Sequence, residues 1–324
     1  MNPRSMLVTG AGGYLGTQLV SGLVAGGIVR GIAALDVREV PEAKRQPGVD
    51  YRVADVRDAE GLQRIFLEKR PEVVVHLASI VTPGKDSNRQ FEYEVDVGGT
   101  TKVLEACRVA GVRRIVVTSS GAAYGYYADN PAWITEDWPI RGNEAFAYAY
   151  HKRLVEELLS AWRKKFPELE QVVFRVGTIL GETVRNQITD LFEKPRLIAI
   201  RGSDSPFVFV WDQDVVGAIV RAADGGPTGI YNVAGDGAMT IHQIAARLGK
   251  PVVAIPAGVL QAALAVLKPL GLTQYGPAQV DFLRYRPVLD NSRLKRVFGF
   301  VPRLTSAEVF ELYLRSHGHR VPAS

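Results

Sequence analysis

The sequence contains almost no cysteine, and this absence narrows the classes of protein to consider. Cys107 is the only cysteine among 324 residues, so the chain has neither an internal disulfide framework nor a multi-cysteine metal site. Cys107 lies in the helical pattern VLEACRVAG, where we predict a buried and unreactive thiol. We expect no bound metal.

Long apolar runs and basic clusters are also missing. The amino terminus lacks a basic segment followed by a long apolar run, which argues against a secretory signal and predicts a cytoplasmic protein. Residues 251–272 are the most apolar stretch, but Pro256, Lys268 and Pro269 leave it short of the ~20 residues that span a bilayer. We therefore expect a buried helix or the wall of an apolar pocket there, and no membrane partner.

The net charge of +5, with a pI near 9.2, suits an anionic ligand. It does not indicate a nucleic-acid partner, because the arginines are scattered and no basic run with interleaved aromatic residues occurs. A content of 47% hydrophobic and 23% charged residues is typical of an ordinary globular protein.

Short apolar runs alternate with helical patterns through the first half of the chain. The runs are rich in valine and isoleucine and occupy residues 5–10, 32–36, 49–55, 72–78, 114–120 and 171–177. Strands that alternate with helices indicate a parallel sheet covered on both faces. We therefore predict an α/β fold with a doubly wound (Rossmann) sheet, whose ligands bind at the carboxyl ends of the strands.

The alternation stops after Gly177. GETVRNQITDLF is typical of a loop that leads into a helix, FVFVWDQD and GIYNVAG of two further strands, and residues 240–272 of a helical stretch. We interpret residues 1–177 as the dinucleotide-binding domain, to which residues 207–238 return. Residues 178–206 and 239–324 are then a smaller, mostly helical, substrate-binding lobe.

The stretch VTGAGGYLG, residues 8–16, has the composition of a phosphate-binding turn. Gly10, Gly13 and Gly16 follow the first strand and open the first helix, with Tyr14 and Leu15 between them. Small residues let the backbone approach a pyrophosphate, and the helix amino end supplies N–H donors and a favourable dipole. A ligand-free glycine-rich turn is the alternative.

Asp36 ends the second strand, 20 residues after Gly16. A carboxylate there accepts hydrogen bonds from the adenosine ribose hydroxyls and repels a 2′-phosphate, so we predict NAD rather than NADP. The neighbours Val37 and Arg38 complete this part of the site, and the charge of Arg38 could soften the preference. The third and fourth strands end at two further groups that we place along the cofactor: Asp55 and Val56, and Leu77, Ala78 and Ser79.

The stretch AYAYHKRLVEELL begins like a helix and carries the candidate acid–base group. Tyr148 and Lys152 are four residues apart and so share a helix face, whereas Tyr150 and His151 point elsewhere. A tyrosine has a reference pKa of about 10, and lowering it by about three units requires about 4 kcal/mol. A cation about 4 Å away supplies roughly that amount at an effective dielectric constant near 20. Lys152 and the positive nicotinamide ring of NAD⁺ could provide such a charge; a surface Tyr/Lys contact is the alternative.

Several motifs, in this order, resemble the extended short-chain dehydrogenase/reductase family, and within it the NAD-dependent epimerase/dehydratase group related to UDP-glucose 4-epimerase. They are TGAGGYLG, Asp55-Val56, HLAS, VTSSGAAYG and YAYHK. The resemblance covers nearly the whole chain. It implies a tyrosine as acid/base, a lysine that lowers its pKa and holds the ribose, and a hydroxyl that binds the reacting oxygen.

By motif these three catalytic residues are Tyr148, Lys152 and Ser120. Ser120 is chosen over Ser119 because it stands four residues before the Tyr124-Gly125 pair. The resemblance also places the HLAS and VTSS segments at the nicotinamide. Its further cofactor-binding residues are Thr118, Ser119, Arg175, Val176 and Gly177.

The sequence departs from the family pattern in ways that bear on the substrate. The family usually has asparagine where Asp96 stands, and dehydratases carry an Asp-Glu pair where Gly121-Ala122 follow the catalytic hydroxyl. Nucleotide-sugar epimerases commonly have an arginine where this chain has Ser205-Pro206, and often an asparagine in place of Thr178. Our candidate substrate residues are Val81, Ser120, Thr178, Asn186 and Arg286; Arg284 could also meet a phosphate.

Three functions remain open. The first is an NAD-dependent epimerase of a nucleotide-activated sugar that acts through a transient keto intermediate. The second is an NAD-dependent dehydrogenase or ketoreductase of a smaller or more lipophilic alcohol. The third is a non-catalytic dinucleotide-binding regulator, against which the intact Ser120, Tyr148 and Lys152 set argues. The resemblance and two apolar-faced helices, near residues 100–110 and 148–159, predict a homodimer.

Overall fold

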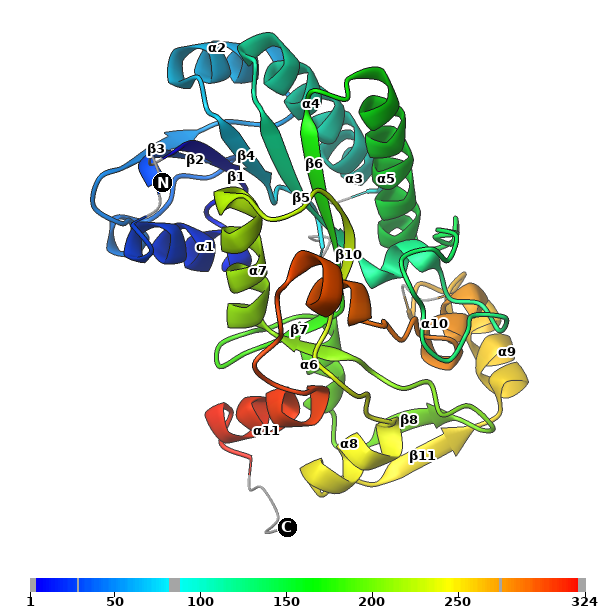
Figure 1. Ribbon diagram of the computed structural model, residues 1–324. Coiled ribbons are helices and arrows are strands. Elements are labelled where there is room, and N and C mark those ends of the chain that lie inside the picture. Colours follow the sequence, from blue (N-terminus) through cyan, green and yellow to red (C-terminus); the bar gives the residue numbers. More distant parts are fainter. Residues whose placement is uncertain (1–3, 28, 82–87, 274–275, 320–324) are drawn as a thin grey trace.

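The chain folds around a parallel sheet, seen in Figure 1 with its flanking helices. The computed structural model describes residues 4–27, 29–81, 88–273 and 276–319. In these residues, seven parallel strands lie in the order β3-β2-β1-β4-β5-β6-β10. Their bounds are β1 Arg4–Thr9, β2 Val29–Asp36, β3 Val49–Val53, β4 Val73–His76, β5 Arg114–Ser120, β6 Glu170–Val176 and β10 Gly229–Val233. The predicted doubly wound α/β fold is confirmed.

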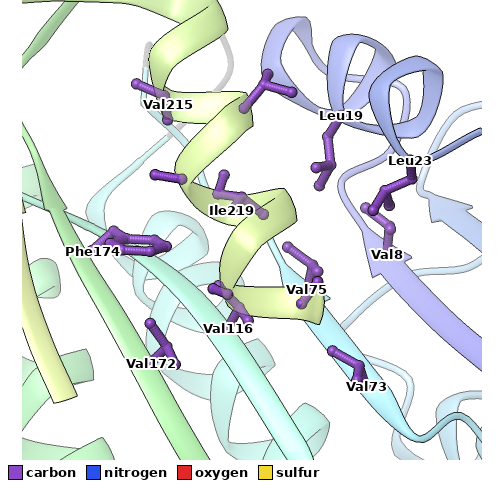
Figure 2. Close-up of a cluster of buried hydrophobic side chains, with 14 of the residues drawn as sticks. Val8, Leu19, Leu23, Val73, Val75, Val116, Val172, Phe174, Val215 and Ile219 are labelled. Carbon is purple, nitrogen blue, oxygen red and sulfur yellow. The ribbon is translucent and has the colours of Figure 1, made fainter. Parts of the chain in front are cut away.

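Alternate residues of the strands face two separate cores. Val8, Val75 and Phe174 face α1 (Tyr14–Ala25) and α7 (Asp212–Asp224), whose Leu19 and Ile219 pack against them (Figure 2). The opposite face is covered by α2 (Ala59–Lys69), α4 (Gly99–Ala110) and α5 (Ala147–Lys165). Because both faces are buried, the strands need nearly continuous apolar runs, which is the pattern of the sequence.

Shorter helical turns connect these layers. Their bounds are η1 Glu42–Lys44, α3 Arg89–Tyr93, η2 Glu94–Gly98, η3 Gly121–Tyr124, η4 Pro277–Gln279 and η5 Leu294–Phe298. Cys107 is fully buried in α4, as predicted, and this burial raises the pKa of its thiol. None of the helices in the described part of the chain has both the length and the apolar character needed to cross a bilayer.

The C-terminal region forms a second layer below the carboxyl edge of the sheet (Figure 1). Its elements are β7 Thr178–Leu180, α6 Gln187–Phe192, β8 Leu197–Ile200, β9 Phe209–Trp211, α8 Ile241–Leu248, β11 Val252–Ile255, α9 Ala257–Leu267, α10 Val280–Arg284 and α11 Ser306–Ser316. Phe192, Phe209 and Phe310 pack edge to face or stacked in its core. β9 pairs with β7, whereas β10 lies in the main sheet beside β6.

The structure corrects the prediction for residues 240–272. In place of one helical stretch it has α8, then β11 in parallel pairing with β8, then α9. α9 is not a buried helix, since none of its residues is buried: Val259 is 61% exposed and Val266 62%. None of its residues lines the active-site cavity described below. The local pattern could not reveal β11, because its partner strand lies more than fifty residues earlier in the chain.

Candidate active site

A cavity of about 460 Å³ opens at the carboxyl ends of β1, β4, β5 and β6. It brings together most of the residues that the sequence singled out. Those that line it are Gly10, Gly13, Tyr14, Leu15, Gly16, Leu77, Ser79, Val81, Thr118, Ser119, Ser120, Tyr148, Lys152, Val176, Gly177, Thr178, Asn186 and Arg286. Eight residues that the sequence singled out lie outside this lining: Asp36, Val37, Arg38, Asp55, Val56, Ala78, Arg175 and Arg284.

The glycines of the first turn allow close backbone approach. Gly10 has φ +70°, and a Cβ there would lie 2.7 Å from the amide nitrogen of Ala78. A Cβ on Gly16 would collide with the carbonyl oxygen of Gly10. In the described structure no side chain caps α1, which begins after Gly13, so its first N–H groups have no side-chain acceptor, and residues 13–16 line the cavity. An uncapped helix start behind a glycine cradle fits the pyrophosphate of a dinucleotide.

Asp36 is held rigidly beside this turn. Its Oδ2 accepts a hydrogen bond of 2.9 Å from the backbone N–H of Gly12, and its Oδ1 one of 3.0 Å from that of Arg38. A side chain on Gly12 would press on the carboxylate, since a Cβ would lie 3.1 Å from Oδ2. The carboxylate is therefore fixed at the end of β2, where we predict that the adenosine ribose binds.

Asp55 and Val56 are held by neighbours of their own. The Arg57 guanidinium donates to both carboxylate oxygens of Asp55, at 2.7–3.1 Å, and holds the pKa of this carboxyl below its usual range. Val56 packs against Gly99 at the start of α4. Both residues therefore have structural partners next to the expected adenine position.

The three candidate catalytic residues meet at the end of β5. Lys152 is 6% exposed, and its Nζ donates to the carbonyl oxygen of Thr118 at 3.1 Å. The same Nζ lies 5.6 Å from the centre of the Tyr148 ring, one helical turn away. Ser120 Oγ accepts a hydrogen bond of 3.2 Å from the backbone N–H of Ala122, which leaves the hydroxyl hydrogen available for another partner.

Ser119 serves a different purpose from Ser120. Its hydroxyl donates to Glu156 at 2.5 Å, and Glu156 forms a buried ion pair of 2.7 Å with Arg175. Burial opposes the positive charge of Arg175, but the carboxylate of Glu156 outweighs this and raises the pKa of the Arg175 guanidinium. The guanidinium also donates to the hydroxyl of Tyr124. The Arg175 side chain thus lies in a polar network behind the cavity, while Val176 and Gly177 line the cavity itself.

The candidate substrate residues differ in how far their polar groups are already engaged. Asn186 caps α6, accepting from the N–H groups of Ile188 and Thr189, and donates to Ile179. Arg286 donates from one guanidinium nitrogen to the carbonyl oxygen of Ser205 at 3.2 Å, and its guanidinium carbon lies 3.7 Å from the ring centre of Phe207. Burial lowers the pKa of Arg286 to about 10, so it remains a cation at neutral pH.

Aromatic side chains form much of the remaining wall, and the sequence analysis missed them. The Phe282 ring lies 4.9 Å from that of Tyr126 and 5.6 Å from that of Phe146, and all three line the cavity with Phe207. Phe146 stands two residues before Tyr148, and this was the one available signal. Phe282 arrives from α10, more than a hundred residues later, and no local pattern marks it.

Tyr150 and His151 lie off the face shared by Tyr148 and Lys152. Tyr150 packs between cations, with the Arg89 guanidinium 5.1 Å and that of Arg153 4.9 Å from its ring centre. His151 is 1% exposed and faces Asp96. No group of three or more His, Cys, Asp or Glu side chains in the described residues is arranged to hold a metal ion.

Comparison with known sequences relates the chain to one family. The profile of the NAD dependent epimerase/dehydratase family matches residues 6–234. A UDP-glucose 4-epimerase of Mycolicibacterium smegmatis is 32% identical over 330 residues, which cover 93% of this chain and 95% of the relative.

Solved structures of the same architecture include bound cofactor. The UDP-glucose 4-epimerase of Thermus thermophilus in complex with NAD is 25% identical, with a TM-score of 0.73 over 98% of this chain and all of its own (100%). The Bordetella bronchiseptica enzyme WbmG in complex with NAD and UDP shares the fold, with a TM-score of 0.75 over 98% of this chain and 94% of its own, at 19% identity.

Proposed function

Because the chain belongs to the NAD-dependent epimerase/dehydratase family and its cofactor is NAD, we propose that it is an epimerase of a nucleotide-activated sugar. One observation carries this proposal. The acid–base set Ser120, Tyr148 and Lys152 shares its cavity with the cation Arg286. A nucleotide sugar needs both, since its diphosphate requires a positive partner and its hydroxyl a base.

The protein groups divide the work in the proposed reaction. Bound NAD supplies a hydride acceptor that can also return the hydride. Tyr148 takes the proton of the substrate hydroxyl and later gives it back to the keto oxygen. Lys152, anchored on the carbonyl oxygen of Thr118, holds a positive charge next to the Tyr148 ring and stabilises its ionised form. Ser120 donates to the reacting oxygen and fixes its position.

Dehydration is disfavoured by the residues that follow Ser120. Gly121 and Ala122 are buried in η3 and carry no acid or base, so the position that eliminates water in dehydratases has no proton donor here. A transient keto intermediate that is reduced again on its other face requires only the three residues already named.

The apolar wall supports a second candidate. Tyr126, Phe146 and Phe282 would suit a smaller or more lipophilic alcohol, oxidised or reduced by the same three residues with exchangeable NAD. The positive charge of Arg286 among these rings favours an anionic substrate instead. A non-catalytic regulator would need none of the catalytic set.

The test is a substrate screen with an isotope readout. The purified protein is incubated with UDP-, dTDP- and GDP-hexoses that carry deuterium at the epimerised carbon, and with secondary alcohols plus NAD⁺. We expect one nucleotide sugar to give its epimer with the deuterium retained, while the Tyr148→Phe variant gives none. Accumulation of free NADH from an alcohol, without any epimer, would identify a dehydrogenase. Mass spectrometry of the released cofactor complements the screen, because an epimerase retains NAD⁺ through each turnover.

A further inference from the structure

A buried carboxylate lies on η2, which packs against the helix that carries Lys152, and has no part in the reaction as described so far. Asp96, in η2, is 2% exposed, and its Oδ1 accepts a hydrogen bond of 2.9 Å from the backbone N–H of Ile80. Its Oδ2 lies 3.5 Å from Nδ1 of His151, and each of the two side chains is 1% exposed. Apart from this contact, neither ring nitrogen of His151 has a hydrogen-bond partner among the described residues.

The carboxylate carries its negative charge at neutral pH. Burial opposes ionisation, yet the imidazole of His151 and the positive charge of Lys152 hold the pKa of Asp96 below its usual range. η2 packs against α5, and the carboxylate of Asp96 interacts with two consecutive residues of that helix, touching His151 and lying within the electrostatic reach of Lys152. A buried charge is weakly screened and is felt by other ionisable groups within several ångströms.

The other charged or titratable groups nearby have partners or carry no charge. His76 is kept neutral by burial, which lowers its pKa to about 4, and the Arg89 guanidinium lies over Tyr150. On the substrate side, Tyr148 faces Tyr126 and Arg286. The remaining groups on the elements packed against α5 are Glu92, Tyr93, Glu94, Tyr124 and Arg114, and Arg114 forms an ion pair of 2.7 Å with Glu170.

We propose that Asp96 is a positioning residue whose negative charge offsets part of the Lys152 positive charge and thereby sets the pH at which Tyr148 gives up its proton. The inference rests on the proposed role of Tyr148 as acid/base. A negative charge near the phenolate disfavours it, so removal of this charge lets Tyr148 ionise at lower pH. Asparagine, usual at this position in the family, would leave Lys152 without that offset.

A purely structural role makes a different prediction. The amide oxygen of asparagine can still accept the hydrogen bond from Ile80, and the side chain has nearly the same shape as aspartate. Asp96→Asn therefore removes the charge and keeps the anchor. If the anchor is all that matters, stability can change but the ionisation of Tyr148 does not move.

The experiment measures this ionisation directly and needs no substrate. The near-ultraviolet absorbance of tyrosinate is titrated in the NAD-loaded protein, and the curve of Tyr148→Phe is subtracted to isolate Tyr148. We expect Asp96→Asn to move the midpoint to lower pH by about half a unit or more. Asp96→Ser, measured in parallel, removes the charge with a smaller side chain and carries the same expectation. Asp214→Asn is the matched control, because Asp214 is equally buried but binds Arg303 in the C-terminal layer, and its midpoint should stay at the wild-type value.

The outcomes separate the two proposals. A midpoint in both Asp96 variants that is unchanged or higher than in the wild type would overturn the role of Asp96 and leave the proposed function intact. A difference curve without any Tyr148 titration would refute the acid/base role itself and this inference with it.

Discussion

The fixed carboxylate of Asp36 allows the cofactor preference to be worked out in advance. A 2′-phosphate brings a charge of about −1.5 to −2, and each unit charge about 4 Å from a carboxylate in water costs about 1 kcal/mol. The carboxylate cannot turn away cheaply, because the N–H groups of Gly12 and Arg38 hold both of its oxygens. The 2′-phosphate also takes away the hydrogen bond from the 2′-hydroxyl to this carboxylate, which is worth about 1.5–3 kcal/mol. The side-chain charge of Arg38 returns part of the total cost. A net difference of about 1.4 kcal/mol or more remains, so NAD should bind at least about tenfold more tightly than NADP.

Calorimetry on the cofactor-free protein checks this value. Titrations with NAD⁺ and NADP⁺ are compared for the wild type, for Asp36→Ser and for the control Asp129→Ser, whose carboxylate pairs with Arg141 at the surface. Asp36→Ser should weaken NAD⁺ binding through the lost ribose contacts and bring the two affinities within a few-fold of each other. Equal affinities in the wild type would show that Arg38 dominates and that the reasoning from Asp36 is wrong.

Three further predictions concern catalysis, stability and assembly. Tyr148→Phe should lower turnover by about 10²–10⁴-fold and leave NAD binding intact. Lys152→Ala should lower both turnover and the affinity for NAD, whereas Tyr150→Phe should change rates only a few-fold. Equal loss of turnover in the two tyrosine variants would contradict the helical-face assignment. Burial lowers the pKa of His76 to about 4, so between pH 6.5 and 4 this imidazole is protonated in the unfolded state but not in the folded state. The free energy of unfolding should therefore fall by about 3 kcal/mol as the pH drops through this window. In urea unfolding, His76→Gln should not show this fall in the free energy of unfolding between pH 6.5 and 4. A fall in the variant as large as in the wild type would refute the assignment to His76. The outer faces of α4 and α5, where Val109 is 40% exposed, should pair in a homodimer. A monomer in light scattering at micromolar concentration would disprove this.

The parts of the fold that local patterns determine were predictable from sequence. The run SMLVTG must be a buried strand because alternate side chains enter two cores, and the glycines after it leave room for a pyrophosphate. The spacing of Tyr148 and Lys152 is a property of one helix. The doubly wound sheet, the family and NAD are therefore confirmed, while the individual site residues stay predictions that the mutations above test.

Contacts between distant segments were not predictable in this way. Asp96 and His151 are 55 residues apart and come from different helices, so nothing local shows that they meet. The same holds for the ion pair of Glu156 with Arg175, which joins residues of α5 and β6. β11 was hidden inside an apolar stretch, and α9 could be placed at the surface only from its tertiary context.

The burial of Cys107 makes the natural chain effectively inert toward thiol-reactive dyes. Because its thiolate is both inaccessible and disfavoured, a cysteine introduced elsewhere becomes the single reactive position without any background substitution. A fluorophore or spin label on Val259→Cys would report directly on the surroundings of α9, and one on Val109→Cys would test the predicted subunit contact through α4. Distances in solution can therefore be measured with site-directed labels without first replacing Cys107.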